Sequence, residues 1–398
     1  MDIRQLLDAK LRLSPLGALF SAQFLSAFVD NMILFIALAI IKRDGYPDYY
    51  LPFVQSTFLA SYIVLSPWVG RFADKKAKAR VLIVGNLVKV AGVVLLLLGI
   101  NPASSYAVVG IGAVIYSPAK YGILPFLTRN EDELLRANSG LESYTILAIL
   151  AGSVTGGFLA DLSINMALVT SIVLYGASIG INMLIPKDAG NRGIGYENAI
   201  REFFADTAIL LKHPPSHYSL LGTGSFWLSS ALLRMIIFAW VPLTLGITSG
   251  TAISMIIAVT GVGIAIGAVV TPYLISIKTY RRTVWFGFAM GLGILAFLAI
   301  SSLPVAIGFL LLVGALGGIY IVPMNACLQQ VGHHTIGAGK TIAVQNFMEN
   351  TFMFLGVGSY TLATKVGIAT NTSLAATGFV LLLLVGYLWA LSRRKNSV

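Results

Sequence analysis

Residues 70–100 read GRFADKKAKARVLIVGNLVKVAGVVLLLLGI, a short basic segment followed by a long apolar one. The apolar part, from Val81 to Ile100, holds one charged side chain, Lys89. A helix of about 20 apolar residues crosses the hydrocarbon core of a bilayer, and lysines and arginines concentrate in the loops on the cytoplasmic side. The stretch therefore predicts a transmembrane helix that is preceded by a cytoplasmic loop.

The same pattern recurs along the whole chain. Lipid-facing backbone must satisfy its own hydrogen bonds, so only helices and closed barrels span a bilayer, and none of the apolar stretches alternates as barrel strands do. We therefore predict an all-α polytopic membrane protein. Its twelve expected transmembrane helices cover residues 16–40, 52–70, 81–100, 104–127, 139–160, 165–185, 218–245, 251–276, 284–301, 304–330, 341–364 and 370–391.

The composition excludes a soluble globule. Hydrophobic residues make up 57% of the 398 residues and charged residues 11%, with a mean hydropathy of +0.84. Soluble domains carry roughly 25% charged residues, so this chain has too few to face water on all sides. The single cysteine, Cys327, rules out an internal disulfide and a cysteine-based zinc site. We predict neither a cofactor nor a metal.

The basic residues predict the orientation of the helices. The formal net charge is +11, and 21 of the 27 lysines and arginines fall in segments on the side of the N-terminus. The opposite loops hold only Lys42, Arg43 and Lys365. This bias indicates two cytoplasmic termini and argues against nucleic-acid binding as the cause of the charge. The basic segments are 1–15, 71–80, 128–138, 186–217, 277–283, 331–340 and 392–398.

The longest loop divides the chain into two equal sets of helices. We predict an N-terminal six-helix bundle at 1–186, a cytoplasmic linker at 187–217 and a C-terminal six-helix bundle at 218–398. Within the linker, residues 196–212 mix aromatic and aliphatic side chains with charged ones. This pattern fits a helix that lies in the membrane interface, and it fits an ordinary interdomain helix nearly as well.

Charged residues inside the expected spans point to a functional chamber. A charge at the middle of a bilayer costs about 2.5–3.5 kcal/mol on insertion scales, so such residues usually line a cavity, form pairs and take part in function. Because acids and bases are equally represented here, we predict a wet chamber between the two bundles. The residues are Asp30, Lys89, Lys120, Glu142, Arg234 and Glu349.

These side chains and their polar neighbours suggest two kinds of role. Arginine binds a phosphate through two hydrogen bonds of its guanidinium, and lysine binds it as a point charge. An acidic side chain could bind an ammonium group or carry a proton. Asp30 and Arg234 have comparable depths and are expected to face each other, as substrate ligands or as a structural pair. The predicted substrate-binding residues are Asp30, Asn31, Tyr116, Lys120, Arg234, Gln345, Asn346 and Glu349. Lys89 and Glu142 are expected nearer the cytoplasmic side, as gating or anchoring residues.

The two-bundle layout and one loop resemble the major facilitator superfamily of transporters. In the loop after the second span, Gly70 and Asp74 are four residues apart and basic residues follow, as in that family's signature. The resemblance implies that Asp74 meets a helix end of the other half and holds the outward-open state, with Lys78 and Arg80 pairing nearby. The chain departs from the signature at Ala77, where the family usually has glycine.

Four further segments resemble the bacterial lysophospholipid transporters over essentially the whole chain. They are the segment around Asp30, YSPAKYGIL at 116–124, VPMNA at 322–326, where Met324 replaces the usual leucine, and AVQN at 343–346. The resemblance implies a monomeric flippase of the bacterial inner membrane. Such a protein moves lysophosphatidylethanolamine and lysophosphatidylglycerol from the outer to the inner leaflet by alternating access, and a cytoplasmic acyltransferase then reacylates them.

Two other functions are alternatives to lipid transport. A proton-coupled major facilitator exporter of drugs or small metabolites could use the same fold, with Asp30 or Glu349 as the proton carrier. An enzyme is disfavoured because acyl transfer would need a histidine followed four residues later by aspartate. That pattern is absent at the histidines, which are His213, His217, His333 and His334.

Overall fold

The computed structural model describes residues 14–393, apart from the side chains of Glu131, Asp132, Leu135, Arg136, Asn138, Ser139, Glu142, Ile277, His333 and Ala338. Over these residues the chain forms helices and loops without strands, which confirms the all-α fold class. The predicted cytoplasmic termini involve residues 1–13 and 394–398, which lie outside the described part.

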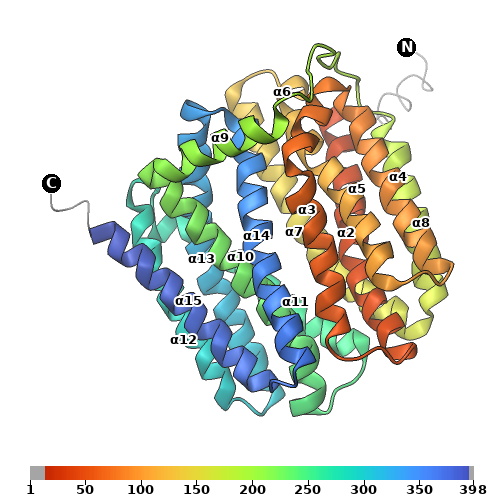
Figure 1. The fold of residues 1–398 in the computed structure, drawn as a ribbon, viewed down its shortest axis with the longest axis vertical. Helices are drawn as coiled ribbons and strands as arrows, with labels where there is room; N and C mark the ends of the chain where they lie inside the picture. The colour runs from red at the N-terminus through yellow and green to blue at the C-terminus, as the bar shows by residue number, and fades with distance from the viewer. Residues whose placement is uncertain (1–13, 394–398) are drawn as a thin grey trace, which may run out of the picture.

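Each predicted span falls on a long helix (Figure 1). These helices are α2 (Pro15–Arg43), α3 (Tyr50–Lys75), α4 (Lys78–Leu97), α5 (Pro102–Gly122), α7 (Glu131–Leu162), α8 (Ile164–Asn182), α10 (Pro214–Trp240), α11 (Gly250–Leu274), α12 (Val284–Ala296), α13 (Leu303–Thr335), α14 (Ala338–Lys365) and α15 (Thr370–Arg393). The shorter elements are α6 (Leu124–Leu127), α9 (Ala199–Lys212), the π-helical turn η1 (Val241–Leu245), and the 3₁₀ helices η2 (Ile277–Thr283) and η3 (Phe297–Ala299).

One helix begins well before its predicted span. The apolar residues of α7 start near residue 139, but the helix itself starts at Glu131 because the Asn130 side chain caps it. The Asn130 Oδ1 atom accepts a hydrogen bond of 2.8 Å from the backbone N–H of Glu133. Such a cap satisfies an N–H group that has no partner within the helix, so the polar first turns stay helical.

Nine helices in the described part of the chain are long and apolar enough to cross a membrane. The long helices that fall short are α3, α5 and α14. A helix that is apolar all round faces lipid or a dry core, whereas a helix that borders a polar cavity must carry polar residues on one side. The position of these three helices is therefore the first indication of where a cavity lies.

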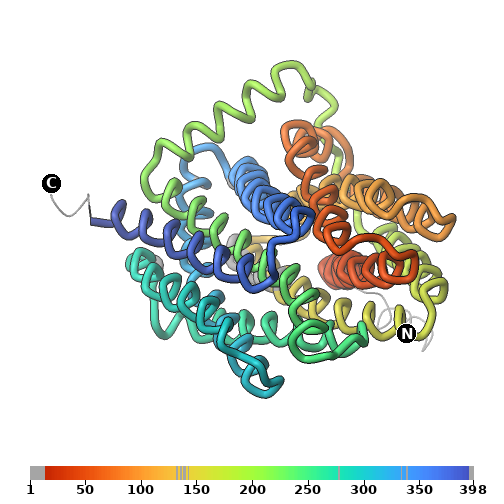
Figure 2. Tube along the Cα trace, turned by 60° about the horizontal axis from the view of Figure 1, so that its bottom comes forward, coloured from red at the N-terminus to blue at the C-terminus, as the bar shows by residue number. Residues whose placement is uncertain are grey.

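The helices pack in two groups that meet along two seams. In the first group α2 packs on α7 and α8, and α4 packs on α5 and α8; in the second, α10 packs on α13, α14 and α15, and α11 packs on α13. Between the groups, α3 lies against α14 and α7 lies against α11. Figures 1 and 2 show α14, in blue, beside α3, in red-orange.

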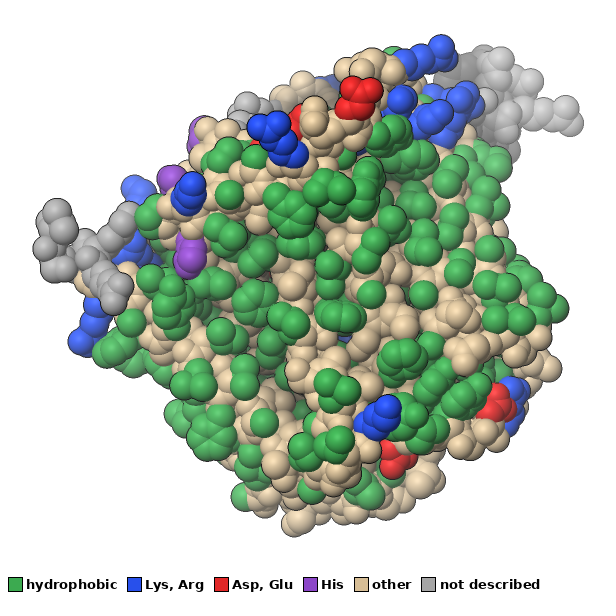
Figure 3. Space-filling model, viewed as in Figure 1, with side chains coloured by type: hydrophobic (Ala, Val, Ile, Leu, Met, Phe, Trp, Pro, Cys, Tyr) green, Lys and Arg blue, Asp and Glu red, His purple; other side chains and the backbone are tan. Residues whose placement is uncertain are grey.

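The loops gather on two opposite sides of the molecule (Figure 1), and most of the charged side chains visible in Figure 3 lie at the same two ends. The N–H of Asn191 donates to the carbonyl of Asp74 at 2.9 Å, which joins segments 71–80 and 186–217 on what we call the basic side. At the other end, the Tyr50 hydroxyl donates to Asn101 Oδ1 at 2.7 Å, and we call this end the far side. The positive-inside rule predicts that the basic side is cytoplasmic.

Helix α9 lies across the basic side and contacts both groups. Its apolar face packs on α10 and α14, where the Phe203 and Phe347 rings are 5.2 Å apart. Arg71 of α3 forms an ion pair with Glu202, and Lys340 of α14 forms one of 2.9 Å with Asp206. The segment is therefore a linker helix that is held from both sides (Figure 2).

Candidate functional site

A cavity of about 510 Å³ lies between the two groups of helices and reaches the basic side. Its walls come from α3, α5 and α14, the three helices whose low hydropathy set them apart, and α9 covers part of it. Polar groups from both bundles therefore meet here. The polar and charged lining residues are Tyr62, Ser66, Arg71, Asp74, Ser117, Tyr121, Glu202, Asp206, Lys340 and Asn346.

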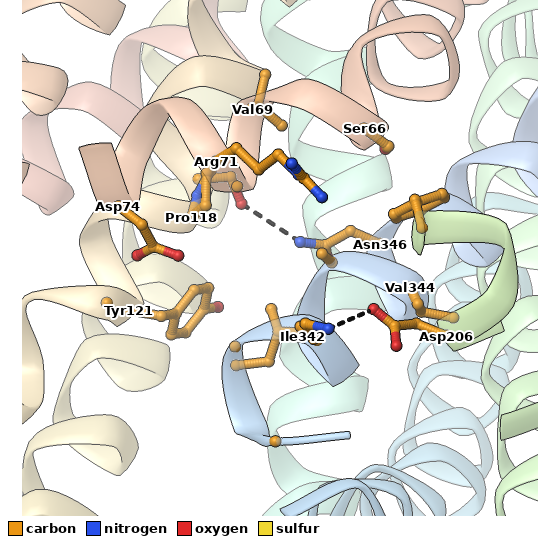
Figure 4. Close-up of a pocket in the computed structure, with 18 of the residues that line it drawn as sticks. Ser66, Val69, Arg71, Asp74, Pro118, Tyr121, Asp206, Ile342, Val344 and Asn346 are labelled. Atoms are coloured by element: carbon orange, nitrogen blue, oxygen red, sulfur yellow. Dashed lines mark hydrogen bonds and ion pairs between the residues drawn. The ribbon is translucent and has the colours of Figure 1, made fainter. Parts of the chain in front are cut away.

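Few direct contacts cross this cavity (Figure 4). Asn346 of α14 donates through Nδ2 to the hydroxyl of Ser117 on α5, at the long distance of 3.4 Å. Asp74 and Tyr121 lie on one wall, opposite Ile342 of α14. The side chain of Asp74 is 59% exposed, so its carboxylate is not engaged with a helix of the other half. The basic side of the α3–α14 seam is consequently open.

The structure places Asp30 in a buried ion pair within the first bundle. Its Oδ2 atom is 2.7 Å from Nζ of Lys89 on α4, and its Oδ1 atom accepts a hydrogen bond of 2.6 Å from the hydroxyl of Tyr175 on α8. The Lys89 side chain is 1% exposed and that of Asp30 is 21% exposed. The predicted pairing of Asp30 with Arg234 is thus replaced by Asp30–Lys89, and Lys89 lies at the depth of Asp30 rather than nearer the cytoplasm.

Neutral polar groups continue this ion pair into the bundle. Lys89 also donates to the Ser26 hydroxyl at 2.8 Å, and that hydroxyl donates to Asn86 Oδ1 at 2.8 Å. Asn86 in turn donates to the hydroxyl of Ser178 at 2.9 Å. A buried charge is tolerated only when its hydrogen-bonding capacity is met. The network therefore ties α2, α4 and α8 together and leaves one edge of Asp30 accessible.

Arg234 of α10 has a different environment. It is half-buried, and it forms no hydrogen bond or ion pair with any residue that the structure describes. Phe238, one turn later on the same face, packs against Phe35 of α2 with ring centroids 5.2 Å apart. Arg234 therefore faces the first bundle with its guanidinium uncompensated.

On α14 two predicted residues form a polar pair. Gln345 donates through Nε2 to Glu349 Oε1 at 2.8 Å and to Asn325 Oδ1 of α13 at 2.9 Å. Glu349 is 7% exposed. The amide thus holds the carboxylate against the core of the second bundle. The predicted ammonium-binding role of Glu349 remains a prediction.

The predicted substrate residues do not all share the cavity. Of that set only Asn346 lines it, whereas the predicted gating residues Gly70 and Asp74 both do. The deep charged residues lie outside this lining, and Asp30 is paired with Lys89 inside its own bundle.

The other predicted residues have local partners. Asn31 donates to the carbonyl of Ala27 at 2.8 Å, the Tyr116 ring lies 4.8 Å from the ammonium of Lys89, and the Lys120 ammonium lies 4.8 Å from the centre of the Tyr121 ring. Lys78 is 3.7 Å from Asp74. Arg80 is exposed and has no ion pair with a described residue, and the side chain of Glu142 lies outside the described part.

Sequence reasoning missed the group that closes the far side. Asp161, at the end of α7, accepts hydrogen bonds from the backbone N–H groups of Gly250 (3.0 Å) and Thr251 (2.7 Å). It also accepts from the hydroxyls of Ser249 (3.0 Å) and Thr251 (2.7 Å). A carboxylate at a helix N-terminus satisfies free N–H groups and complements the helix dipole. Asp161 therefore clamps the start of α11 to the first bundle.

A glycine makes this clamp possible. A Cβ atom at Gly157 would lie 2.5 Å from the Ser254 hydroxyl and 2.6 Å from the carbonyl of Gly250, too close for any side chain. Asp161 follows Gly157 by four residues, the same spacing that separates Asp74 from Gly70. This repeated spacing was the one signal in the sequence that could have drawn attention to Asp161.

The helical arrangement and the cavity between two bundles define a membrane transporter of the alternating two-bundle class. A sequence profile of the Major Facilitator Superfamily matches residues 19–357. Among solved structures, the nucleoside transporter NupG superposes with a TM-score of 0.71 at 11% identity, over 95% of this chain and 99% of that one. A POT family transporter gives a TM-score of 0.72 at 12% identity, over 95% and 96%.

Relatives of higher identity refine this class. The chain is 42% identical over 381 residues to the lysophospholipid transporter LplT of Klebsiella pneumoniae subsp. pneumoniae, covering 95% of this chain and 96% of the relative. It is 41% identical over 392 residues to LplT of Serratia proteamaculans, covering 98% of each. The chain therefore belongs to the lysophospholipid transporter family of the major facilitator superfamily.

Proposed function

We propose that this chain transports lysophosphatidylethanolamine and lysophosphatidylglycerol from the outer to the inner leaflet of the bacterial inner membrane by alternating access. Lysophospholipid transport itself follows from the membership of the family. The direction, the two headgroups and delivery to a cytoplasmic acyltransferase are our proposal, as is action as a monomer. The rival function, export of drugs or small metabolites, differs from the one that the names of these relatives give.

The observation that carries the proposal is the unpaired guanidinium of Arg234. The two proposed headgroups differ in their terminal group but share a phosphate, so a common site must bind that phosphate. Arginine binds phosphate through two parallel hydrogen bonds, and Arg234 faces the first bundle without a partner among the described residues. The cavity toward the basic side would then release the lipid to the cytoplasmic leaflet.

The closed far side fits the step of the transport cycle in which the cargo is released to the basic side. In the structure Asp161 holds α7 to α11, while the α3–α14 seam encloses a cavity that reaches the basic side. A carrier in this arrangement can release cargo to the basic side and excludes entry from the far side. Uptake from the outer leaflet requires the opposite arrangement, in which the far side opens.

Substitution of Arg234 tests the phosphate site. A charge-assisted hydrogen bond is worth about 1.5–3 kcal/mol. Arg234→Met should therefore raise the concentration of either lysolipid that gives half-maximal uptake about tenfold or more. Arg234→Lys keeps the charge but loses the bidentate geometry of the guanidinium. Its half-saturating concentration should lie between those of Arg234→Met and the wild type. The measurement is uptake of radiolabelled lysolipid by spheroplasts of a strain without its own lysophospholipid transporter.

Reacylation in the same spheroplasts reports the direction of transport. Label that reaches the inner leaflet becomes diacyl phospholipid through the cytoplasmic acyltransferase, and label that stays outside does not. Arg129→Met, an exposed site on the basic side, serves as the matched control and should behave as the wild type. Equal uptake by Arg234→Met and the control would remove the phosphate role, and no reacylated product with the wild type would remove the proposed direction.

A further inference from the structure

A second cavity, of about 410 Å³, opens on the basic side of the first bundle, away from the seam between bundles. Five basic side chains surround it, from the α3–α4 turn and from the loop after α8, together with one acid. They are Lys75, Lys76, Arg80, Lys187, Arg192 and Asp188. Like charges repel, so a cavity with this lining needs an explanation.

Most of this positive charge is uncompensated. Lys78 occupies both carboxylate oxygens of Asp188, through its backbone N–H at 2.6 Å and its ammonium at 3.1 Å. The Lys75 ammonium lies 4.8 Å from the centre of the Tyr196 ring. The remaining basic side chains form no ion pair with any described residue, and they are Lys76, Arg80, Lys187 and Arg192.

Specific backbone contacts bring the two basic segments together. The N–H of Asn191 donates to the carbonyl of Asp74 at 2.9 Å. Gly190 has φ +61°, and a Cβ there would lie 2.8 Å from the backbone of Lys76. The positive-inside rule explains why basic residues are frequent in these loops. It does not explain why segments more than 100 residues apart are docked so that their cations share one cavity.

Exposed apolar side chains lie close in sequence to the lining of the cavity. Met183 and Leu184, just before Lys187, are 63% and 62% exposed. On α4, Leu87 is 52% exposed and lies two turns from Arg80 on the same face. Exposed apolar residues on transmembrane helices contact acyl chains, and basic residues at the helix ends meet headgroups. The cavity is thus at the level of the phosphates.

We propose that this cavity binds the phosphate of an anionic phospholipid, of the phosphatidylglycerol type, in the cytoplasmic leaflet. The ligand carries net negative charge because the lining holds an excess of cations, which a zwitterionic headgroup would not neutralise. A soluble anion or an acidic peptide would fill the charged part but would make no use of the apolar surface below it. This lipid is a bound partner rather than cargo, so the inference goes beyond the proposed function.

Fluorescence quenching tests the site directly. In a Cys327→Ser background, Leu184→Cys carries a fluorophore, and the protein is reconstituted into phosphatidylcholine vesicles. Phosphatidylglycerol with brominated acyl chains, added at a few mole per cent, should quench this fluorophore more strongly than brominated phosphatidylcholine does. Each cation near an anionic surface is worth about fivefold in binding. Lys187→Gln/Arg192→Gln should therefore raise the half-quenching mole fraction at least fivefold.

A matched pair in the second bundle controls for overall charge. Lys278→Gln/Arg282→Gln removes the same charge from exposed residues on the basic side and should leave the quenching unchanged. Equal quenching by the two brominated lipids in the wild type would overturn the proposal, whether or not the variants fold. Displacement by sodium phosphate, but not by sodium chloride of equal ionic strength, would assign the cavity to free phosphate instead. Displacement by a polyglutamate peptide would assign it to an acidic protein partner.

Discussion

Asp30→Asn and Lys89→Met are each expected to destabilise the protein strongly, and to restore most of the lost stability when combined. The Lys89 side chain is 1% exposed and has Asp30 as its only carboxylate among the described residues. Removing one partner of a buried ion pair leaves an uncompensated charge, which costs about 3–5 kcal/mol. Removing both partners leaves neutral groups of similar size, which is often close to neutral in stability.

The measurement is the free energy of unfolding from a denaturant titration of the purified protein. Tyr175→Phe provides the control, because it removes one hydrogen bond to Asp30 without changing the charge, and should cost about 1.5–3 kcal/mol, less than the loss of either charge. If Asp30 served the substrate alone, Asp30→Asn would abolish uptake at unchanged stability, and adding Lys89→Met would rescue nothing. That result would contradict the structural role of the pair.

Asp161→Ala should shift the protein toward the state that is open on the far side. The clamp consists of a carboxylate and four donors at the start of α11. Because the site is exposed, the clamp should stabilise the closed far side by about 2 kcal/mol, near the low end for hydrogen bonds to charged groups. Its loss corresponds to about a 30-fold change in the ratio of the two states. Lysolipid uptake should fall, since the cycle must pass through the closed far side.

A buried reporter cysteine measures this opening. Ser254 is fully buried in the α7–α11 seam, and Ser254→Cys in a Cys327→Ser background should react slowly with an impermeant maleimide added outside spheroplasts. Asp161→Ala should raise the labelling rate about 30-fold. Asp44→Asn, on the same side but with Arg43 as its only ion-pair partner among the described residues, should leave it unchanged. Unaltered labelling of the Asp161 variant would mean that other contacts close the far side.

Hydropathy predicted the helices well because membrane insertion depends chiefly on local composition. The pairing of charges needed more than composition. Span ends were known to about four residues, which is about 6 Å along a helix, and this error is enough to place Lys89 nearer the cytoplasm than Asp30. Only packing shows that α4 brings Lys89 within 2.7 Å of Asp30. Asp161 was not predicted because a charged residue at the end of a span lies near water and has little desolvation cost, so its position in the sequence does not suggest a function.

The existence of the cavity was likewise predicted from the sequence, but its lining residues were not. A shared chamber between the bundles was predicted from six intramembrane charges, but none of the five whose side chains are described lines the cavity. Ser117 and Asn346 meet across it, whereas the charged residues Asp30 and Glu349 are held within their own bundles. Which polar face of a helix meets the opposite bundle depends on tertiary packing, and hydropathy carries no information about it.

The recurrence of one glycine–aspartate spacing at opposite membrane surfaces has an energetic consequence. Asp161 is docked on the first turn of α11, while Asp74 lines the same cavity as Gly337 and Gly339, where α14 begins. If Asp74 docks there in the reverse state, as its signature implies, the two dockings are mutually exclusive and their free energies subtract. The free-energy difference between the two states of the carrier is then a small difference between two docking free energies of similar size. Neutralising both acids together should leave that balance nearer its original value than neutralising either alone.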